Sequence, residues 1–235
     1  MLPLRDANPT RRIPVITVAL IAACCAVFLV ELGISSGPDG EAALERSFAT
    51  WGAVPGDISA ALTGSGDPWI AIRGLLGSLF LHAGWTHLLG NMLFLWIFGN
   101  NVEDRLGRGP FVTFYLVGGL AAALAQTLVE PSSRVPLVGA SGAIAATLGA
   151  YIVLYPRARI TSLLFLGIVV QLIEVPAVVI LGLWFALQLV SGAASLGATT
   201  AQGGVAFFAH IGGFLGGAAI GLLARGAPRS TRPGG

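Results

Sequence analysis

Long apolar stretches dominate this chain, and they restrict its fold more than any other feature. Hydrophobic residues make up 55% of its 235 residues and charged residues only 10%, and the mean hydropathy is +0.83. Soluble domains carry roughly 25% charged residues. Because a helix needs about 20 apolar residues to cross a bilayer, a chain of this length has room for about six spans. We therefore expect an all-α, polytopic membrane protein.

The apolar stretches divide the chain into a membrane domain and two tails. We expect a cytoplasmic N-terminal tail at 1–12, a membrane domain at 13–224 with an outer loop at 34–81, and a cytoplasmic C-terminal tail at 225–235. Within the outer loop, residues 37–68 are polar and rich in glycine and proline, so this part and the termini are where loose structure is expected. The six expected spans are residues 13–32, about 85–98 with a further turn at either end, 111–129, 137–155, about 175–190 and about 205–223.

The number of spans depends on how the apolar region 160–190 is interpreted. It is long for one span and short for two, and Gln171, Glu174 and Pro176 interrupt it. Basic residues favour the cytoplasmic side of a membrane protein, and a single span here gives the stronger bias. We therefore expect residues 160–173 to be an irregular or interfacial lead-in, six spans in all, and both termini in the cytoplasm. The cytoplasmic arginines would be Arg5, Arg11, Arg12, Arg105, Arg108, Arg157, Arg159, Arg225, Arg229 and Arg232, against Arg46, Arg73 and Arg134 outside.

A serine and a histidine lie near the outer ends of two expected spans. Ser141 enters the fourth span and His210 the sixth, each within one or two turns of the end, so the two side chains can meet at one depth. Ionisable residues inside a membrane mark candidate functional sites, and a neutral imidazole can take the proton of a serine hydroxyl. No Asp or Glu follows Glu174. We therefore predict a catalytic Ser141–His210 dyad without a carboxylate, with helix-start N–H groups near Ser141 favouring an oxyanion.

Small residues around both positions favour close helix packing. Gly139 precedes Ser141 and Gly142 follows it, and the sixth span has overlapping GxxxG spacings. Small residues spaced in this way let helix backbones approach closely. They are expected to support the site by packing, and they are Gly142, Ala146, Gly149 and Ala150 in the fourth span and Gly212, Gly213, Gly216, Gly217 and Gly221 in the sixth.

The two remaining histidines accompany a buried amide at the second span. His87 and Asn91 are four residues apart and share a helix face. His82 can approach Asn91 only if the helix begins after it, for which Gly84 and Thr86 offer start signals. Histidine and asparagine side chains can donate to an oxyanion, so His82 and Asn91 are candidates for transition-state stabilisation. His87 is a candidate support that ties the outer loop to the helix.

Several other kinds of chemistry have weaker support in the sequence. We expect no metal, because the histidines lack an HExxH motif and cysteine partners, and no cofactor. The adjacent Cys24 and Cys25 cannot join distant segments. Gly64-Ser65-Gly66-Asp67 matches the GxGD string of intramembrane aspartyl proteases, but no second intramembrane aspartate accompanies it, so a turn is expected. A net charge of +2 with no lysine does not indicate a nucleic-acid partner.

Four sequence blocks together resemble the rhomboid family of intramembrane serine proteases, over roughly residues 73–223. They are HAGWTH (82–87) with Asn91, FGNNVEDRLGR (98–108), GASGAIAATLGAY (139–151) and AHIGGFLGG (209–217). The resemblance implies a six-span rhomboid-like bundle with Ser141 as nucleophile and His210 as general base. It implies an oxyanion hole made by His82, Asn91 and the Ser141 backbone N–H. It also implies substrates that are other membrane proteins, cut in or near a transmembrane helix.

Two positions depart from the family pattern. Many members carry Trp-Arg ahead of the first histidine, whereas this chain has Ile72-Arg73, so the outer loop is expected to pack differently. Many also place an aromatic residue four positions after the nucleophile to stack on the base, but here that residue is Ala145. We therefore expect other neighbours to hold His210, with Phe207, Phe208 and Phe214 available nearby.

The sequence leaves one alternative function open: a catalytically idle rhomboid-like scaffold that binds membrane proteins or serves their quality control. A scaffold would not need a reactive serine. The expected location is a bacterial inner membrane, with the lipid bilayer and membrane-protein substrates as partners. The oligomeric state, the substrate and the cleavage site have no sequence signature.

Overall fold

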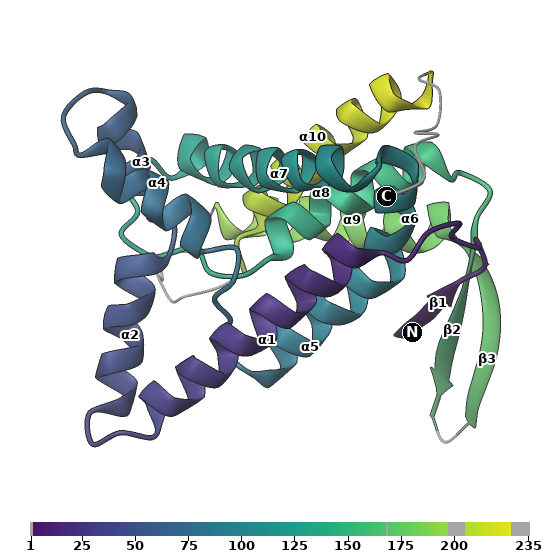
Figure 1. The fold of residues 1–235 in the computed structure, drawn as a ribbon, viewed down its shortest axis with the longest axis horizontal. Helices are drawn as coiled ribbons and strands as arrows, with labels where there is room; N and C mark the ends of the chain where they lie inside the picture. The colour runs from purple at the N-terminus through teal and green to yellow at the C-terminus, as the bar shows by residue number, and fades with distance from the viewer. Residues whose placement is uncertain (1, 168, 197–204, 227–235) are drawn as a thin grey trace.

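The computed structural model describes residues 2–167, 169–196 and 205–226, and this part of the chain is mostly helical (Figure 1). A three-stranded sheet at one end is the departure from the expected all-α fold. The helical elements are α1 (Val15–Ser35), α2 (Gly40–Trp51), α3 (Pro55–Leu62), α4 (Pro68–Gly77), α5 (Trp85–Phe94), the π-helical turn η1 (Leu95–Gly99), α6 (Asn100–Leu106), α7 (Arg108–Val129), α8 (Ser141–Leu154), α9 (Ala177–Ser195) and α10 (Phe207–Arg225). The strands are β1 (Leu2–Asp6), β2 (Arg159–Leu166) and β3 (Val169–Pro176).

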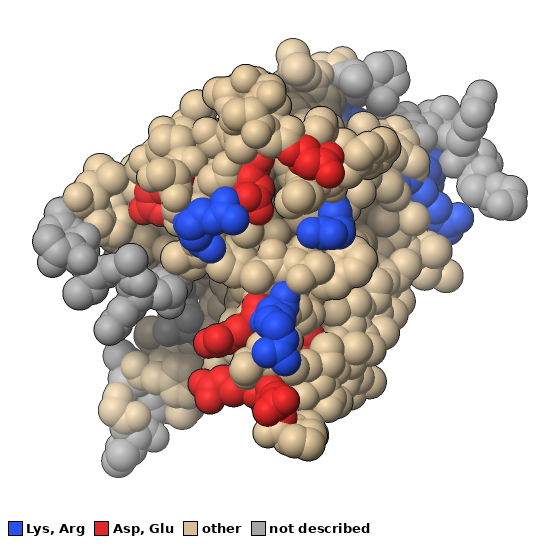
Figure 2. Space-filling model, turned by 90° about the vertical axis from the view of Figure 1, so that its left-hand side faces the viewer, with Lys and Arg blue, Asp and Glu red and all other residues tan. Residues whose placement is uncertain are grey.

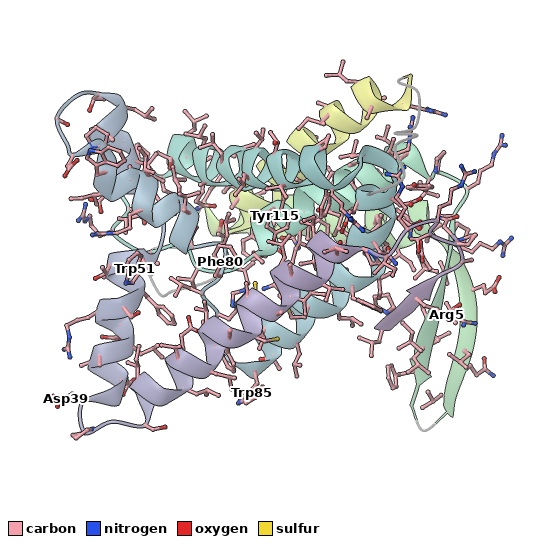
Figure 3. The ribbon with its side chains drawn as sticks, viewed as in Figure 1. Arg5, Asp39, Trp51, Phe80, Trp85 and Tyr115 are labelled. Carbon is pink, nitrogen blue, oxygen red and sulfur yellow. The ribbon has the colours of Figure 1, made fainter. Side chains whose placement is uncertain are left out.

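The bundle has two distinct ends. Helices α2, α3 and α4 lie at one end, together with the starts of α5, α8 and α10, and the sheet lies at the other (Figure 1). Asp39 and Trp51 mark the first end and Arg5 the second (Figure 3). Helices α5 and α6 join through η1 into one continuous helix, 85–106. Residues 227–235, most of the expected C-terminal tail, lie outside the described residues.

The helices identify an integral, multi-pass membrane protein. Within the described part of the chain, α1, α7, α9 and α10 are each long and apolar enough to cross a membrane. Helix α8 has only 14 residues and is apolar. At 1.5 Å per residue it is about 21 Å long, shorter than the roughly 30 Å hydrocarbon core of a bilayer.

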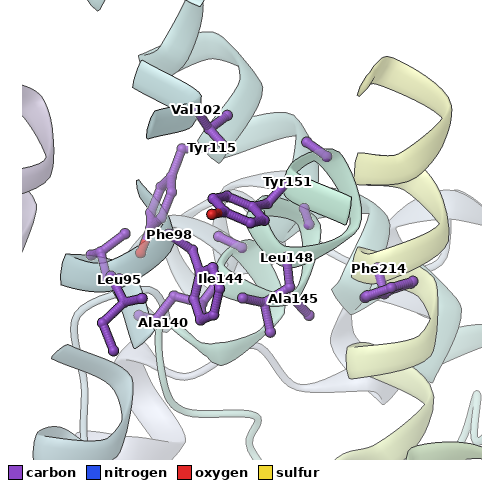
Figure 4. Close-up of a cluster of buried hydrophobic side chains, with 14 of the residues drawn as sticks. Leu95, Phe98, Val102, Tyr115, Ala140, Ile144, Ala145, Leu148, Tyr151 and Phe214 are labelled. Atoms are coloured by element: carbon purple, nitrogen blue, oxygen red, sulfur yellow. The ribbon is translucent and has the colours of Figure 1, made fainter. Parts of the chain in front are cut away.

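Helix α8 forms the centre of the bundle. Its residues from Ala143 to Tyr151 are all buried, between α7 and α10 and beside the helix 85–106 (Figure 4). Glycines make the close approach possible: a Cβ at Gly149 would lie 1.9 Å from the Phe214 carbonyl oxygen, and one at Gly217 would lie 1.9 Å from the Ala146 carbonyl oxygen. The expected packing through small residues is therefore present in the structure.

Replacing Gly217 with alanine is expected to destabilise the protein strongly. The added methyl group would meet backbone rather than a flexible side chain, so α8 and α10 must separate. Overpacking of this kind costs about 1–3 kcal/mol of unfolding free energy. Gly182→Ala in α9, where no atom lies within 4 Å of the new Cβ, is the matched control. Thermal unfolding in detergent should separate the two variants, and equal melting temperatures would contradict this packing.

The outer loop is helical rather than loose. Helices α2, α3 and α4 fill most of the polar stretch, and Asp67 of the GSGD string accepts a hydrogen bond from the Trp69 N–H (2.9 Å), which caps α4. Arg73 donates from Nε to the Thr50 carbonyl (3.0 Å) and lies over the Trp51 ring, so α4 is tied to α2. Figure 2 shows charges of both signs scattered over this end on a largely uncharged surface.

Two backbone connections join this loop to the segment that leads into α8. Ala53 and Leu137 exchange N–H···O hydrogen bonds of 3.0 and 2.8 Å. The Gly139 N–H donates to the Ser78 carbonyl (2.8 Å). The loop therefore positions the chain directly before Ser141.

Residues 160–173 were expected to be an irregular or interfacial lead-in to the fifth span, and the structure shows that they are not irregular but belong to a β-hairpin. Strands β2 and β3 pair antiparallel, from Arg159 opposite Pro176 to Leu166 opposite Val169. The expected N-terminal tail supplies the third strand, because β1 pairs antiparallel with β2. Apolar residues lie on both faces of these strands, so the sequence lacks the alternation of apolar and polar residues that would have predicted a strand. Helix α9 follows the hairpin as the single helix expected in this region.

Buried polar contacts fasten the N-terminal segment to the bundle. The Asp6 carboxylate accepts from Asn101 Nδ2 (2.5 Å) and from the Tyr151 hydroxyl (2.9 Å). Glu103 accepts from the N–H and hydroxyl of Thr17 (both 2.8 Å), which satisfies free donors at the start of α1. These contacts hold the sheet end of α1, α6 and α8 together.

Candidate active site

Ser141 and His210 meet at the end of the bundle opposite the sheet. Ser141 is the first residue of α8 and His210 the fourth of α10, and Ser141 Oγ lies 2.9 Å from His210 Nε2. A Cβ at Gly213 would lie 2.3 Å from the Gly142 carbonyl oxygen, so the two helices are nearly in backbone contact beside the pair. Both side chains are half-buried. A serine at this distance can pass its proton to the imidazole.

Gly139 lets His87 approach the serine. Its φ of +121° favours glycine, and a Cβ there would lie 2.7 Å from the His87 ring and 3.6 Å from Ser141 Oγ. His87 Nδ1 accepts a hydrogen bond from the Ala83 N–H (3.3 Å). This contact ties the start of α5 to the loop before it, and the supporting role of His87 stays a prediction.

His82 lies in the loop before α5, as the sequence predicted. Its ring is buried, 5.2 Å from that of His87, and Nδ1 lies 3.0 Å from the Phe80 carbonyl oxygen. Because a carbonyl only accepts, Nδ1 carries the proton of the neutral ring and Nε2 carries a lone pair. Nε2 is buried, and no residue in the described part of the chain forms a hydrogen bond with it. His82 can therefore donate to an oxyanion from Nε2 only when its ring is doubly protonated.

Asn91 presents a second unpaired polar group. It lies on α5 one turn after His87, on the same face, and α5 packs against α8. Its Nδ2 is buried and has no hydrogen-bond partner among the described residues. Buried donors are almost always paired, so an unpaired amide on a helix that packs against α8 is suited to a group that appears only during reaction. The Ser141 N–H lies in the first turn of α8, where backbone donors have no intrahelical acceptor.

Besides Ser141, two immediate neighbours of His210 come from α9, which the sequence analysis did not anticipate. Gln188 Oε1 lies 2.8 Å from His210 Nδ1, and the Trp184 ring lies 5.8 Å from the imidazole with an interplanar angle of 38°. With Ala145 at the position where many family members carry an aromatic residue, Trp184 is the aromatic neighbour of the His210 ring, whereas Phe214 stacks on Phe185. The spacing of Trp184 and Gln188, four residues apart on an apolar helix, was the available signal.

The described residues thus form a multi-pass helical membrane protein with a hydrogen-bonded serine and histidine at one end of its bundle. The Rhomboid domain family matches residues 70–227, well over half of the chain. The chain therefore belongs to the rhomboid family. Members of this family are generally intramembrane serine proteases that act on membrane-protein substrates.

Individual relatives match parts of the chain. It is 34% identical over 155 residues to Rhomboid protease GluP of Bacillus subtilis (strain 168), which covers 65% of this chain and 27% of that protein. It is 30% identical over 145 residues to Rhomboid protein 1, mitochondrial, of Saccharomyces cerevisiae, covering 60% of this chain and 38% of that protein. The chain thus spans less than two fifths of the length of either relative.

Proposed function

We propose that this protein is an intramembrane serine endopeptidase that cleaves transmembrane or juxtamembrane segments of other membrane proteins. The observation that carries the proposal is the 2.9 Å contact between Ser141 Oγ and His210 Nε2. In the proposed reaction the hydroxyl proton moves to Nε2 while Oγ attacks the scissile carbonyl carbon. The imidazolium then returns this proton to the leaving amine, and water hydrolyses the resulting ester by the same route in reverse.

The proposed oxyanion hole consists of the Ser141 N–H, Asn91 Nδ2 and, when its ring is doubly protonated, His82 Nε2. Two side-chain nitrogens that have no hydrogen-bond partner among the described residues support this assignment. Ser141 is also the first residue of α8, where a backbone N–H has no acceptor within the helix. The groups would stabilise the negative charge that forms on the carbonyl oxygen in the tetrahedral intermediate.

The proposed topology has six spans and cytoplasmic termini in a bacterial inner membrane, with α2, α3 and α4 outside. The spans are α1, the helix 85–106, α7, α8, α9 and α10. Arg5, Arg105 and Arg159 belong to the sheet end, whereas Arg46 and Arg73 belong to the other, in agreement with the basic bias of cytoplasmic segments. Because α8 is shorter than the hydrocarbon core, Ser141 would lie below the outer surface, and water would enter from outside.

Cysteine labelling should test this topology. In a Cys24→Ala, Cys25→Ala background, single cysteines at the exposed positions Ser65 and Ser132 are expected to react with a membrane-impermeant maleimide on intact spheroplasts. A cysteine at the exposed Gln171 of β3 is expected to react only after permeabilisation. The inverse pattern would reject the proposed orientation.

A fluorophosphonate probe should separate the protease from an idle scaffold. Such a probe forms a covalent bond with an activated serine, so labelling of the wild type and its loss in Ser141→Ala would support the protease. Two outcomes would favour the scaffold. The first is equal labelling of the wild type and of Ser141→Ala. The second is no labelling of either protein together with no cleavage of membrane-protein substrates.

A further inference from the structure

Helix α9 presents one polar and one aromatic side chain to the same imidazole. Most of its 19 residues are apolar, yet Gln188 points at His210 and is only half-exposed. Trp184, one turn earlier on the same face, lies beside the ring. An amide in an apolar helix costs free energy unless it is paired, and this one is paired with the second nitrogen of the proposed base.

The contact has a direct consequence for the protonation of His210. An amide oxygen only accepts a hydrogen bond, so Oε1 at 2.8 Å from Nδ1 requires the proton of the neutral ring to be on Nδ1. Nε2, at 2.9 Å from Ser141 Oγ, then carries the lone pair that a general base needs. In the opposite tautomer Nε2 would carry the proton and could not accept one from the serine.

We propose that Gln188 is a positioning residue for the reaction: its side-chain oxygen holds His210 in the Nδ1–H tautomer and in the orientation that faces Ser141. This inference rests on the proposed function, because it assigns Gln188 a task only if His210 acts as a base. During the reaction the Ser141 hydroxyl proton joins Nε2, Nδ1 keeps its proton, and the Gln188 carbonyl dipole faces the positive ring. A neutral amide thus occupies the place where soluble serine proteases use a carboxylate.

Among the described residues, the other groups packed around His210 do not supply this acceptor. From α7, Gln126 Oε1 accepts from the Ala209 backbone N–H (3.1 Å) and so holds the helix rather than the ring. Ser141, on α8, contacts the other ring nitrogen, Nε2. His87, on α5, is a titratable group that interacts with the His210 ring only electrostatically. Trp184 packs beside the ring, but its indole nitrogen can only donate a hydrogen bond and so cannot serve as the acceptor for Nδ1.

Removing the amide should lower turnover more than substrate affinity. Gln188→Met keeps the approximate length of the side chain but has no comparable acceptor, so the ring is free to change tautomer and orientation. The expected loss in kcat is about 10- to 100-fold with KM little changed, below the roughly 10⁴-fold cost of a wrong tautomer in a soluble triad. Leu187→Met, at an exposed neighbouring position, is the matched control and should retain wild-type kinetics.

The tautomer can be measured without any substrate. In protein labelled with ¹⁵N-histidine, the ring nitrogens of the three histidines give distinct patterns for the Nδ1–H and Nε2–H forms, and His210→Gln identifies the pattern of interest. We expect the Nδ1–H form of His210 in the wild type and a mixture of forms in Gln188→Met. Gln188→Glu keeps the acceptor, so it should restore the Nδ1–H proton and move the acid limb of the kcat profile to higher pH, because a carboxylate stabilises the imidazolium.

Any of three results would overturn the inference. They are an Nε2–H tautomer of His210 in the wild type, no change of the His210 tautomer in Gln188→Met, or the same pH profile and rate for Gln188→Met and Gln188→Glu. Failure of the proposed function would look different. In that case Ser141→Ala would cleave substrate or bind the fluorophosphonate as well as the wild type, whatever the tautomer of His210.

Discussion

Ser141→Ala and His210→Ala are each expected to abolish detectable proteolysis while leaving the protein folded and inserted in the membrane. The nucleophile and base act as one unit, so losing either should cost nearly as much as losing both, roughly 10⁶-fold in kcat by comparison with soluble serine proteases. The side chains are half-buried at one end of the bundle and their removal leaves the packed centre of α8 intact. The measurement is cleavage of a transmembrane substrate reconstituted in liposomes, together with thermal unfolding of each variant.

The double variant is the decisive control for this pair. If Ser141→Ala with His210→Ala were far slower than either single variant, the two residues would act independently and the dyad would be rejected. A chelator is expected to leave the rate unchanged, because no step of the proposed reaction uses a metal. Loss of activity with chelator would instead favour a metal site at the histidines.

Asn91→Ala is expected to lower kcat by about 10²–10³, the cost of one oxyanion-hole donor in soluble serine proteases. An amide that bonds mainly to the tetrahedral intermediate contributes to the transition state and little to substrate binding, so KM should change little. Because Nδ2 makes no hydrogen bond to any residue that the structure describes, its loss should also leave the melting temperature close to that of the wild type. Steady-state kinetics and thermal unfolding on the same preparation test both points.

His87→Ala provides the contrast for this prediction. His87 holds the Ala83 N–H and packs against Gly139, so its removal should mainly lower the melting temperature. An Asn91→Ala variant that unfolds, beside a His87→Ala variant that is stable and inactive, would reverse the two assignments. His82 can donate from Nε2 only when its ring is doubly protonated, which depends on pH. The Asn91 amide does not titrate, so it can donate to the oxyanion at every pH.

Much of the site could be read from the sequence because it depends on local patterns. An isolated serine and an isolated histidine at the outer ends of two apolar stretches have few partners other than each other, and their flanking glycines show that the helices can approach closely. The positions of His82 before α5 and of Asn91 on the same face of α5 as His87 followed from helix start signals and from the four-residue spacing of a helix face. The resemblance to the rhomboid family rested on the same residues.

Other features depended on contacts between distant segments. The β-hairpin at residues 159–176 was hidden because its apolar residues show no alternation, and its pairing with residues 2–6 joins segments more than 150 positions apart. The helices of the outer loop form where short amphipathic segments find partners, as Arg73 finds Thr50 and Trp51. Polarity and glycine content alone indicated a loop there.

The sequence by itself determined that the protein is a helical membrane protein and which serine and histidine are the candidates for reaction, since apolar length and isolated polar residues are properties of single segments. Only the tertiary structure decided which side chains hold His210, the proposed base. Gln188 and Trp184 lie on α9, more than 20 positions before His210, and their direction depends on how α9 packs beside α10. A hydrogen bond of 2.8 Å between two helices is set by their rotation and separation, and no pattern along one chain segment encodes these quantities.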